Sequence, residues 1–340
     1  MATSQVRNSH HLIRTFAILY PPRKNPRSNP LTETRLPNLV IAGIVKGGTT
    51  SLYSYLSEHP DICCSSVKET CYFSMYRYGQ LDSRYQGSDD PFAQFQGYFC
   101  HCKDQKYVME ATPGYFEGGA RVATEIKKTL GGTTKILIVL RNPVDRLVSF
   151  WKYKKSMLQI DSTLTLAGYI DLCQSMPQQE RLKQENDRYW GIEGGYYANY
   201  LEDWLEIFGT SLKVLFFDDL KQDSTAFLKE TCEWLGIDDA FIETLDLDVQ
   251  NKSVGYKNAW LQQLALSIND RAEKFWRANQ GIKNFLRTVY YAINGQPHQG
   301  GTDEQTLTQI QTIYQPYNQR LALQLRSHGY NKLPNWLQNT

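Results

Sequence analysis

The sequence predicts an α/β fold in which a central parallel sheet is flanked by helices. Between residues 38 and 236, short apolar runs alternate with segments of helical pattern, and parallel strands need such crossover helices. A glycine-rich turn at residues 43–51 follows one apolar run and precedes a helix, which is the arrangement of phosphate-binding loops. We therefore expect a P-loop-like single domain, with a helical C-terminal elaboration from about residue 258.

Four apolar runs are the expected strands, at residues 38–42, 106–109, 135–140 and 213–217. The run at 135–140 is apolar along nearly its whole length, as in strands buried on both faces of a parallel sheet. Hydrophobic residues make up 41% of the chain, which is ample for a buried core. The strands are thus expected to lie inside the domain.

Helices are expected at residues 50–58, 121–130 and 225–235, and from residue 143 onward. Asn142 is suited to cap the helix that begins at Pro143, and Gly236 to end the helix before it. A capping box at residues 302–305, which starts at Thr302, predicts a last helix that extends to about Arg326. Residues 259–294 mix basic and aromatic side chains; packing of the aromatic rings is favoured there over binding to a membrane surface.

Charge and cysteine content exclude several classes of function. The net charge of +2 gives no bulk attraction to nucleic acid, and no apolar run is long enough to span a membrane. Seven scattered cysteines do not suggest a disulfide framework, so we expect a reducing compartment and a cytoplasmic location. The triplet Cys100-His101-Cys102 lacks a second pair of ligands, and no metal site is expected. The oligomeric state is not predicted.

Residues 1–37 differ in composition from the rest of the chain. They hold six lysines and arginines, one glutamate and a cluster of prolines. We expect a flexible basic leader, followed by one domain over residues 38–340. An organelle-targeting peptide, which is also rich in arginine and poor in acids, is the alternative for the leader.

The glycine-rich turn is the first segment with candidate functional residues. It matches the G-x-x-x-x-G-K-[ST] frame, except that Thr49 stands in the lysine position and the lysine is Lys46. Backbone N–H groups at a helix N-terminus can bind an anion, and nearby hydroxyls can donate to it. A glycine-rich turn without a ligand is the alternative. The candidate anion-binding residues are Lys46, Gly47, Gly48, Thr49, Thr50 and Ser51.

Two further segments carry candidate residues. Arg141 follows the expected strand at 135–140, at the sheet edge where such folds bind ligands, and its guanidinium suits a phosphate. Ser149, about two turns into the next helix, can donate a hydroxyl on the same side. A simple salt bridge is the alternative for Arg141. Glu69 is either a general base or a surface partner of Lys68, and spacing alone favours the surface role.

Together these segments resemble the sulfotransferases. The motifs are Lys-Gly-Gly-Thr-Thr from residue 46, Lys-Glu-x-x-Tyr-Phe from residue 68, Glu-Ala-Thr-Pro-Gly-Tyr-Phe from residue 110 and Leu-Arg-Asn-Pro-x-x-Arg-x-x-Ser from residue 140. They are similar to the branch that contains the heparan sulfate N- and O-sulfotransferases and their bacterial relatives. The similarity extends from about residue 38 to residue 236.

The resemblance implies 3′-phosphoadenosine 5′-phosphosulfate (PAPS) as donor, with no metal required. Residues 46–51 would bind its 5′-phosphosulfate, and Arg141 and Ser149 its 3′-phosphate. Lys46 would stabilise charge on the oxygen that bridges sulfur and phosphorus. That role explains the displaced lysine, because the lysine of triphosphate-binding loops contacts β- and γ-phosphates, which PAPS lacks. Glu69 would take the proton of an acceptor hydroxyl, or of an amine, on a glycan or small molecule.

The sequence departs from the family in two places. Ala111 stands where the glycan enzymes have a lysine, and the adenine-side loop has no clear match; residues 251–257 are the candidate, with Lys257 as a binding residue. Residues 76–102 are expected to help form the acceptor cleft, or to be an ordinary surface segment. The competing bases are His101 and, less favoured, His59. The rival functions are a small-molecule P-loop kinase and a non-catalytic PAPS-binding protein.

Overall fold

The structure is a computed structural model that describes residues 35–181, 183–247, 255–272, 280–296 and 302–338. Residues 1–34 of the predicted leader, and residues 251–254 of the predicted adenine-side loop, lie outside these ranges. In the described part of the chain, none of the helices has both the length and the apolar character needed to cross a bilayer.

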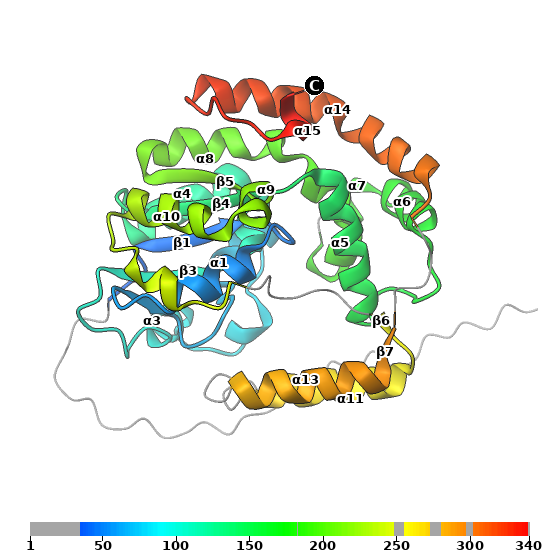
Figure 1. The fold of residues 1–340 in the computed structure, drawn as a ribbon, viewed down its shortest axis with the longest axis horizontal. Coiled ribbons are helices and arrows are strands. Elements are labelled where there is room, and N and C mark those ends of the chain that lie inside the picture. Colours follow the sequence, from blue (N-terminus) through cyan, green and yellow to red (C-terminus); the bar gives the residue numbers. More distant parts are fainter. Residues whose placement is uncertain (1–34, 182, 248–254, 273–279, 297–301, 339–340) are drawn as a thin grey trace, which may run out of the picture. The chain divides into compact units, whose positions relative to one another are not determined.

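A five-stranded sheet forms the centre of the domain (Figure 1), and every pair of neighbouring strands is parallel. The strand order is β2-β3-β1-β4-β5. Because β1 lies between β3 and β4, its carboxyl end is the position where open α/β sheets bind their ligands. The strands are β1 (Leu39–Gly43), β2 (Ile62–Cys64), β3 (Tyr107–Ala111), β4 (Lys135–Leu140) and β5 (Leu212–Phe216).

Side chains of the central strands alternate between two apolar layers. Val40 and Ile138 belong to one buried cluster, and Leu39 and Leu137 to the other, all with no exposed surface. Burial of each such side chain contributes roughly 1.5–3 kcal/mol, so both faces of the sheet stabilise the fold. One face packs on α4 (Gly119–Leu130), α8 (Leu201–Phe208), α14 (Glu304–Ser327) and α15 (Asn335–Gln338). The other packs on α1 (Thr49–Leu56), α9 (Phe217–Gln222) and α10 (Ser224–Leu235).

A third apolar cluster lies beside the sheet. It joins α5 (Pro143–Ser156), α6 (Leu166–Ser175) and the first half of α14 through buried residues such as Trp151, Tyr169 and Ile310. The antiparallel strands β6 (Gly255–Tyr256) and β7 (Gly295–Gln296) pair at the base of a helical hairpin, which consists of α11 (Ala259–Arg271) and α13 (Gln280–Asn294). The short helices are α2 (Met75–Tyr78), α3 (Pro91–Gly97) and α7 (Gln178–Arg181).

The predicted fold class and four strands are confirmed, with strand ends that differ by at most two residues. Asn142 caps α5 as predicted, since its side chain accepts a hydrogen bond from the N–H of Val144. The predicted capping box is wrong by one residue. Asp303, and not Thr302, caps α14, because the Asp303 carboxylate accepts from both the N–H and the hydroxyl of Thr306. Strand β2 was not predicted; three residues are too few to show a pattern.

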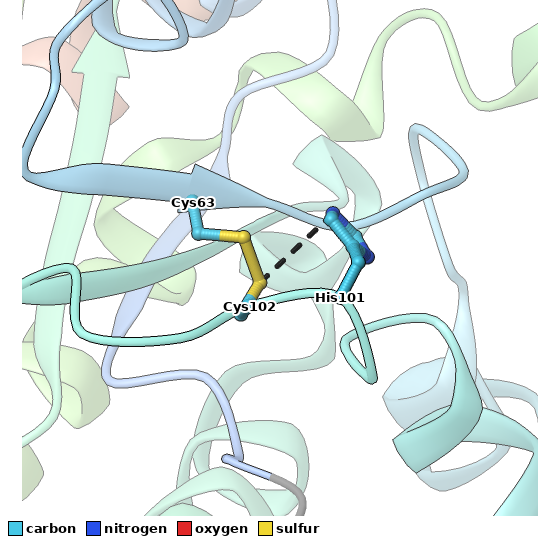
Figure 2. Close-up of side chains that lie close together, drawn as sticks. All are labelled: Cys63, His101 and Cys102. Atoms are coloured by element: carbon cyan, nitrogen blue, oxygen red, sulfur yellow. Dashed lines mark hydrogen bonds between the residues drawn. A yellow bond between two sulfur atoms is a disulfide. The ribbon is translucent and has the colours of Figure 1, made fainter.

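The described residues contain no disulfide framework, but they contain one disulfide, which the expected reducing compartment does not favour. Cys63, in β2, is bonded to Cys102, in the loop before β3, and Figure 2 shows His101 beside them. The two residues are 39 positions apart, and they meet because β2 pairs with β3. Disulfides are typical of oxidising compartments, so the predicted cytoplasmic location loses the argument on which it depended.

The same disulfide bears on the Cys-His-Cys triplet. Cys63, His101 and Cys102 are the one group of potential ligands that the described residues bring close enough to surround a metal ion. Two of the three sulfur and nitrogen atoms are joined to each other, whereas metal ligation by cysteine needs a thiolate. Cys100, the other cysteine of the triplet, is an exposed free thiol.

Candidate active site

A cleft of about 1070 Å³ lies at the carboxyl ends of the central strands. Its walls come from the loop after β1, the segment after β2, the turn after β3, helix α5 and the α11–α13 hairpin. The volume is at the upper end of the range for small-molecule sites. Of the predicted site residues, the cleft is lined by Lys46, Gly48, Thr49, Thr50, Ser51, Glu69, Arg141 and Ser149.

The loop after β1 is shaped by two glycines. A Cβ atom on Gly47 would lie 2.4 Å from the carbonyl oxygen of Val139, and one on Gly48 would lie 2.6 Å from the ring of Phe217. Gly48 also has φ of +93°, a conformation that other residues rarely adopt. Both positions therefore require glycine so that the chain can pass over β4 and enter α1.

The N-terminus of α1 faces this loop without a side-chain cap. Thr49 and Thr50 are its first residues, and N–H groups of a first helical turn have no intrahelical partner. The N–H groups of Thr49 and Thr50 are therefore available to an anion in the cleft. Gly47 differs from the prediction: its N–H donates to the carbonyl of Ile44 at 2.9 Å, and the residue does not line the cleft. The role of Gly47 is structural: without a side chain, the loop can lie close to the carbonyl of Val139.

Lys46 extends its ammonium group over the ring of Tyr153, with 4.5 Å between the nitrogen and the ring centroid. Burial, together with the positive charges of Arg141 and Lys68, lowers the pKa of Lys46 to about 8. The negative charge of Glu69 raises this pKa, but by less than burial and the two cations lower it. A bound phosphate or sulfate would supply a further anion, and would restore the ordinary pKa.

Arg141 lies directly after β4 and touches two other elements. Its guanidinium lies over the ring of Phe217, 4.5 Å from the centroid, and donates to the carbonyl of Lys46 at 3.3 Å. Its Nε is buried and has no hydrogen-bond partner among the described residues. Burial lowers the pKa of Arg141 by more than the negative charges of Asp145 and Asp218 raise it. Ser149, on α5, lines the same cleft.

Glu69 lies in the segment between β2 and α2, with φ of +57°. Its N–H donates to the carbonyl of Ala111 at 3.1 Å, which ties the segment to the end of β3. The side chain is 47% exposed and lies 3.7 Å from the ammonium of Lys68. The predicted ion pair with Lys68 is present, and Glu69 also lines the cleft.

A buried network supports the backbone beneath Glu69. Glu110 has no exposed surface and accepts hydrogen bonds from the hydroxyls of Thr70 at 2.8 Å and Thr112 at 2.5 Å. Thr112 in turn accepts from the N–H of Cys71. Burial raises the pKa of Glu110 to about 7. Glu110 therefore orders the Thr70–Thr112 contact and does not reach the cleft.

Several predicted residues lie elsewhere. Lys257 does not line the cleft, and its ammonium is 3.4 Å from the carbonyl of Ile293 on the hairpin. His59 is buried against Phe241 and bonds the backbone of Asp61 and Asp238. His101 lies by the disulfide. Neither histidine lines the cleft.

The prediction that residues 76–102 help form the cleft is correct for its first third. Arg77 and Tyr78 line the cleft, as does Asp82. In contrast, Phe95 and Phe99 have no exposed surface and belong to the core. This segment turns inward because its later aromatic residues pack on the sheet.

Among the lining residues that the sequence prediction missed are Lys68, Tyr153 and Phe217. Phe217 could have been found, because it is the last residue of the expected strand at 213–217 and so lies at the sheet edge where ligands bind. Tyr153 lies on the same helix as Ser149, four residues on, which places both on one helical face. The sequence predicted Lys68 only as a partner of Glu69, because its contact with Thr50 joins the segment after β2 to the start of α1.

Comparisons with known proteins agree with this geometry. The model of the sulfotransferase domain family matches residues 36–281, which is more than half of the chain, and the protein belongs to the sulfotransferase family. A solved sulfotransferase from Alicyclobacillus acidocaldarius shares the fold, with a TM-score of 0.54 and 24% identity, over 72% of this chain and 95% of that one.

Curated relatives match over shorter stretches. The human heparan sulfate glucosamine 3-O-sulfotransferase 3B1 is 29% identical over 180 residues, 51% of this chain and 39% of that protein. The membrane-associated sulfotransferase kil1 of Dictyostelium discoideum is 32% identical over 127 residues, 36% of this chain and 24% of that protein. The chain thus spans less than half the length of these relatives.

Proposed function

We propose that the protein transfers a sulfuryl group from PAPS to an acceptor hydroxyl, or to an amine, of a glycan or small molecule. The observation that carries this proposal is that Lys46, Arg141 and Glu69, which follow three different strands, line one cleft. The relatives named as 3-O-sulfotransferases support a hydroxyl acceptor. The catalytic domain is proposed to cover residues 38–340, after a leader over residues 1–37.

The cleft suits a donor with two anionic ends. At one end, the uncapped start of α1 and the ammonium of Lys46 would hold the 5′-phosphosulfate. At the other, the guanidinium of Arg141, with its unpartnered buried Nε, and the hydroxyl of Ser149 would hold the 3′-phosphate. PAPS supplies an activated sulfur–oxygen bond. Because Lys46 is placed to neutralise the leaving oxygen, we propose that no metal is required.

The reaction needs one base and one stabilising cation. Glu69 takes the proton of the acceptor hydroxyl while the acceptor oxygen forms a bond to sulfur. The bond between sulfur and the bridging oxygen breaks, and its electron pair stays on the departing 3′,5′-adenosine diphosphate. Lys46 stabilises the charge that grows on that oxygen.

Calorimetry and an assay with labelled PAPS test this proposal. Binding of 3′,5′-adenosine diphosphate should be unchanged by a chelator and stronger than binding of ATP with magnesium, and label should move to an acceptor. Binding of ATP with magnesium alone would indicate a kinase. Binding of 3′,5′-adenosine diphosphate without transfer to any acceptor in a broad panel would indicate a non-catalytic PAPS-binding protein.

A further inference from the structure

The α11–α13 hairpin carries an unusual number of exposed apolar side chains. In the described part of the chain, nine large hydrophobic residues are exposed, and seven of them lie on these two helices. Trp260 and Ile293 are the extremes, at 67% and 63% exposed. An apolar surface of this kind on a soluble domain marks a site of interaction. The seven residues are Trp260, Leu264, Ile268, Leu286, Val289, Tyr291 and Ile293.

These side chains form one stripe on each helix. On α11, Trp260, Leu264 and Ile268 follow each other at intervals of four residues. On α13, Leu286 and Ile293 are seven residues apart, with Val289 between them. Both spacings place the residues on one helical face. In Figure 1 the two helices overlap below the β6–β7 pair, and a hydrogen bond from Tyr290 to Gln262 joins them.

Polar contacts hold the base of the hairpin together and join the hairpin to α5. Asn294 is 1% exposed; its side chain accepts from the N–H of Asn258 at 2.8 Å and donates to the Asn258 carbonyl at 3.1 Å. Gln262 donates to the carbonyl of Ser156, at the end of α5, at 2.6 Å. Tyr290 donates to the side chain of Gln262 and so joins the two helices.

The apolar surface continues into the cleft. Ile268, Leu286 and Tyr291 belong to the exposed set and also line the cleft. Ala265 and Leu266, which are not in the exposed set, line the cleft as well. An acceptor whose hydroxyl lies near Glu69 therefore has an apolar wall leading outward from it. A surface made only for a membrane or for a second copy of the chain would not need to extend into the cleft.

The acceptor side of the cleft carries no excess of positive charge. Apart from Lys46 and Arg141, which belong to the donor end, the charged lining residues are four cations and four acids. Six of them form three ion pairs: Arg77 with Glu117, Lys154 with Asp187 at 3.0 Å, and Lys68 with Glu69 at 3.7 Å. A polyanionic acceptor would find little net attraction there. The eight residues are Lys68, Arg77, Lys154, Arg287, Glu69, Asp82, Glu117 and Asp187.

We infer that the acceptor is a neutral amphiphile, with a hydroxyl-bearing head near Glu69 and an alkyl chain or apolar ring system packed on the hairpin. This inference rests on the proposed sulfotransferase function and names the acceptor class for the same cleft. Burial of hydrocarbon against the apolar wall contributes binding free energy. The balanced charges of the cleft add little attraction for a charged acceptor that would compete with it.

The test is a series of alkyl β-glucosides, from ethyl to decyl, kept below their critical micelle concentrations. With the full chain and labelled PAPS, KM should fall by about two- to fourfold for each added methylene, until the chain passes the hairpin. Leu286→Ser should flatten this dependence, and Ile268→Ser is a second variant of the same kind. Leu323→Ser is the matched control, because Leu323 is 66% exposed on α14 and does not line the cleft.

Four outcomes would overturn the inference. The first is sulfation of sulfated or carboxylated oligosaccharides with no response to alkyl chain length, and the second is a chain-length dependence that Leu286→Ser leaves intact. The third is binding to neutral phosphatidylcholine vesicles that Ile293→Ser abolishes, while alkyl chain length has no effect on KM. The fourth is a dimer in solution that Ile293→Ser dissociates. The last two assign the surface to a membrane or to a second copy.

Failure of the proposed function can be told apart from failure of this inference. If 3′,5′-adenosine diphosphate does not bind, the proposed function is wrong. If it binds but no acceptor is sulfated, calorimetry with octyl glucoside in its presence decides the acceptor class. Binding that weakens at least threefold in Leu286→Ser supports the inference, and absence of binding rejects it.

Discussion

Lys68 donates a hydrogen bond of 2.8 Å from its ammonium group to the hydroxyl of Thr50. Lys68 follows β2 and Thr50 lies in α1, so this bond joins the segment that carries the candidate base to the loop that holds the candidate donor site. The same ammonium is 3.7 Å from the carboxylate of Glu69. Lys68 thus contacts both the donor-site helix, through Thr50, and the candidate base, Glu69.

Replacement of Lys68 by methionine should lower turnover by about 10- to 100-fold, the usual range for loss of a charged hydrogen bond. The physical reason is that Thr50 and Glu69 lose their common partner. Steady-state kinetics with labelled PAPS measures the effect, and Lys68→Arg should recover part of it. Normal turnover in Lys68→Met would show that the contact is only a surface ion pair.

Arg141→Ala should weaken 3′,5′-adenosine diphosphate by about 1.5–3 kcal/mol, because the 3′-phosphate loses a charged donor. Adenosine 5′-phosphate, which lacks that phosphate, should bind nearly as before. Calorimetry with both nucleotides measures the difference, and Arg320→Ala, at an exposed position of α14, is the control. Equal losses for the two nucleotides would assign Arg141 to the support of the loop around Lys46.

Glu69→Gln keeps the size of the side chain and removes its basicity. Turnover should fall by about 10²–10⁴-fold, the contribution typical of a general base. Binding of 3′,5′-adenosine diphosphate should hardly change. His101→Ala should be as active as the unaltered protein, because His101 lies beside the disulfide and outside the cleft. An active Glu69→Gln together with an inactive His101→Ala would reverse the assignment.

Binding of 3′,5′-adenosine diphosphate should depend on pH through Lys46. The pKa of Lys46 is about 8 in the free protein, and a bound anion favours the charged form. Affinity is therefore fully present below about pH 8 and falls as pH rises through that value. Titrations at about pH 7 and about pH 9.5 measure the fall, and Lys46→Arg, which stays charged, should show a smaller one. A similar fall in Lys46→Arg would point to another group.

Stability should fall with rising pH because of Glu110. Its pKa is about 7 in the folded protein and about 4.5 in an unfolded chain, so the folded state holds the proton longer. The free energy of unfolding should decrease by about 2–3 kcal/mol between about pH 5 and about pH 8. Urea denaturation measures this, and Glu110→Gln should reduce the decrease. The control Glu58→Gln, at an exposed position, should leave the decrease in the free energy of unfolding unchanged.

The sequence predicted those features that depend on neighbouring residues. Strands β1 and β4 are apolar runs, and the loop after β1 and Arg141 after β4 could be placed at the sheet edge from order alone. Contacts set by the crossing of distant segments could not be predicted. Lys68 reaches Thr50, and Cys63 meets Cys102, only because β2 pairs with β3 at the sheet edge. The position of Lys257 outside the cleft could not be predicted either, since the β6–β7 pairing places its ammonium near the carbonyl of Ile293.

The β6–β7 pair has a consequence for how the enzyme could diversify. The chain enters the hairpin through Gly255–Tyr256 and returns through Gly295–Gln296, so both ends of the insertion meet at one short ladder. No strand of the five-stranded sheet is contributed by it. A hairpin of different length or chemistry could therefore be grafted at this junction while the donor end of the cleft stays as it is. Acceptor preference and sulfuryl chemistry would then evolve as separate traits of one scaffold.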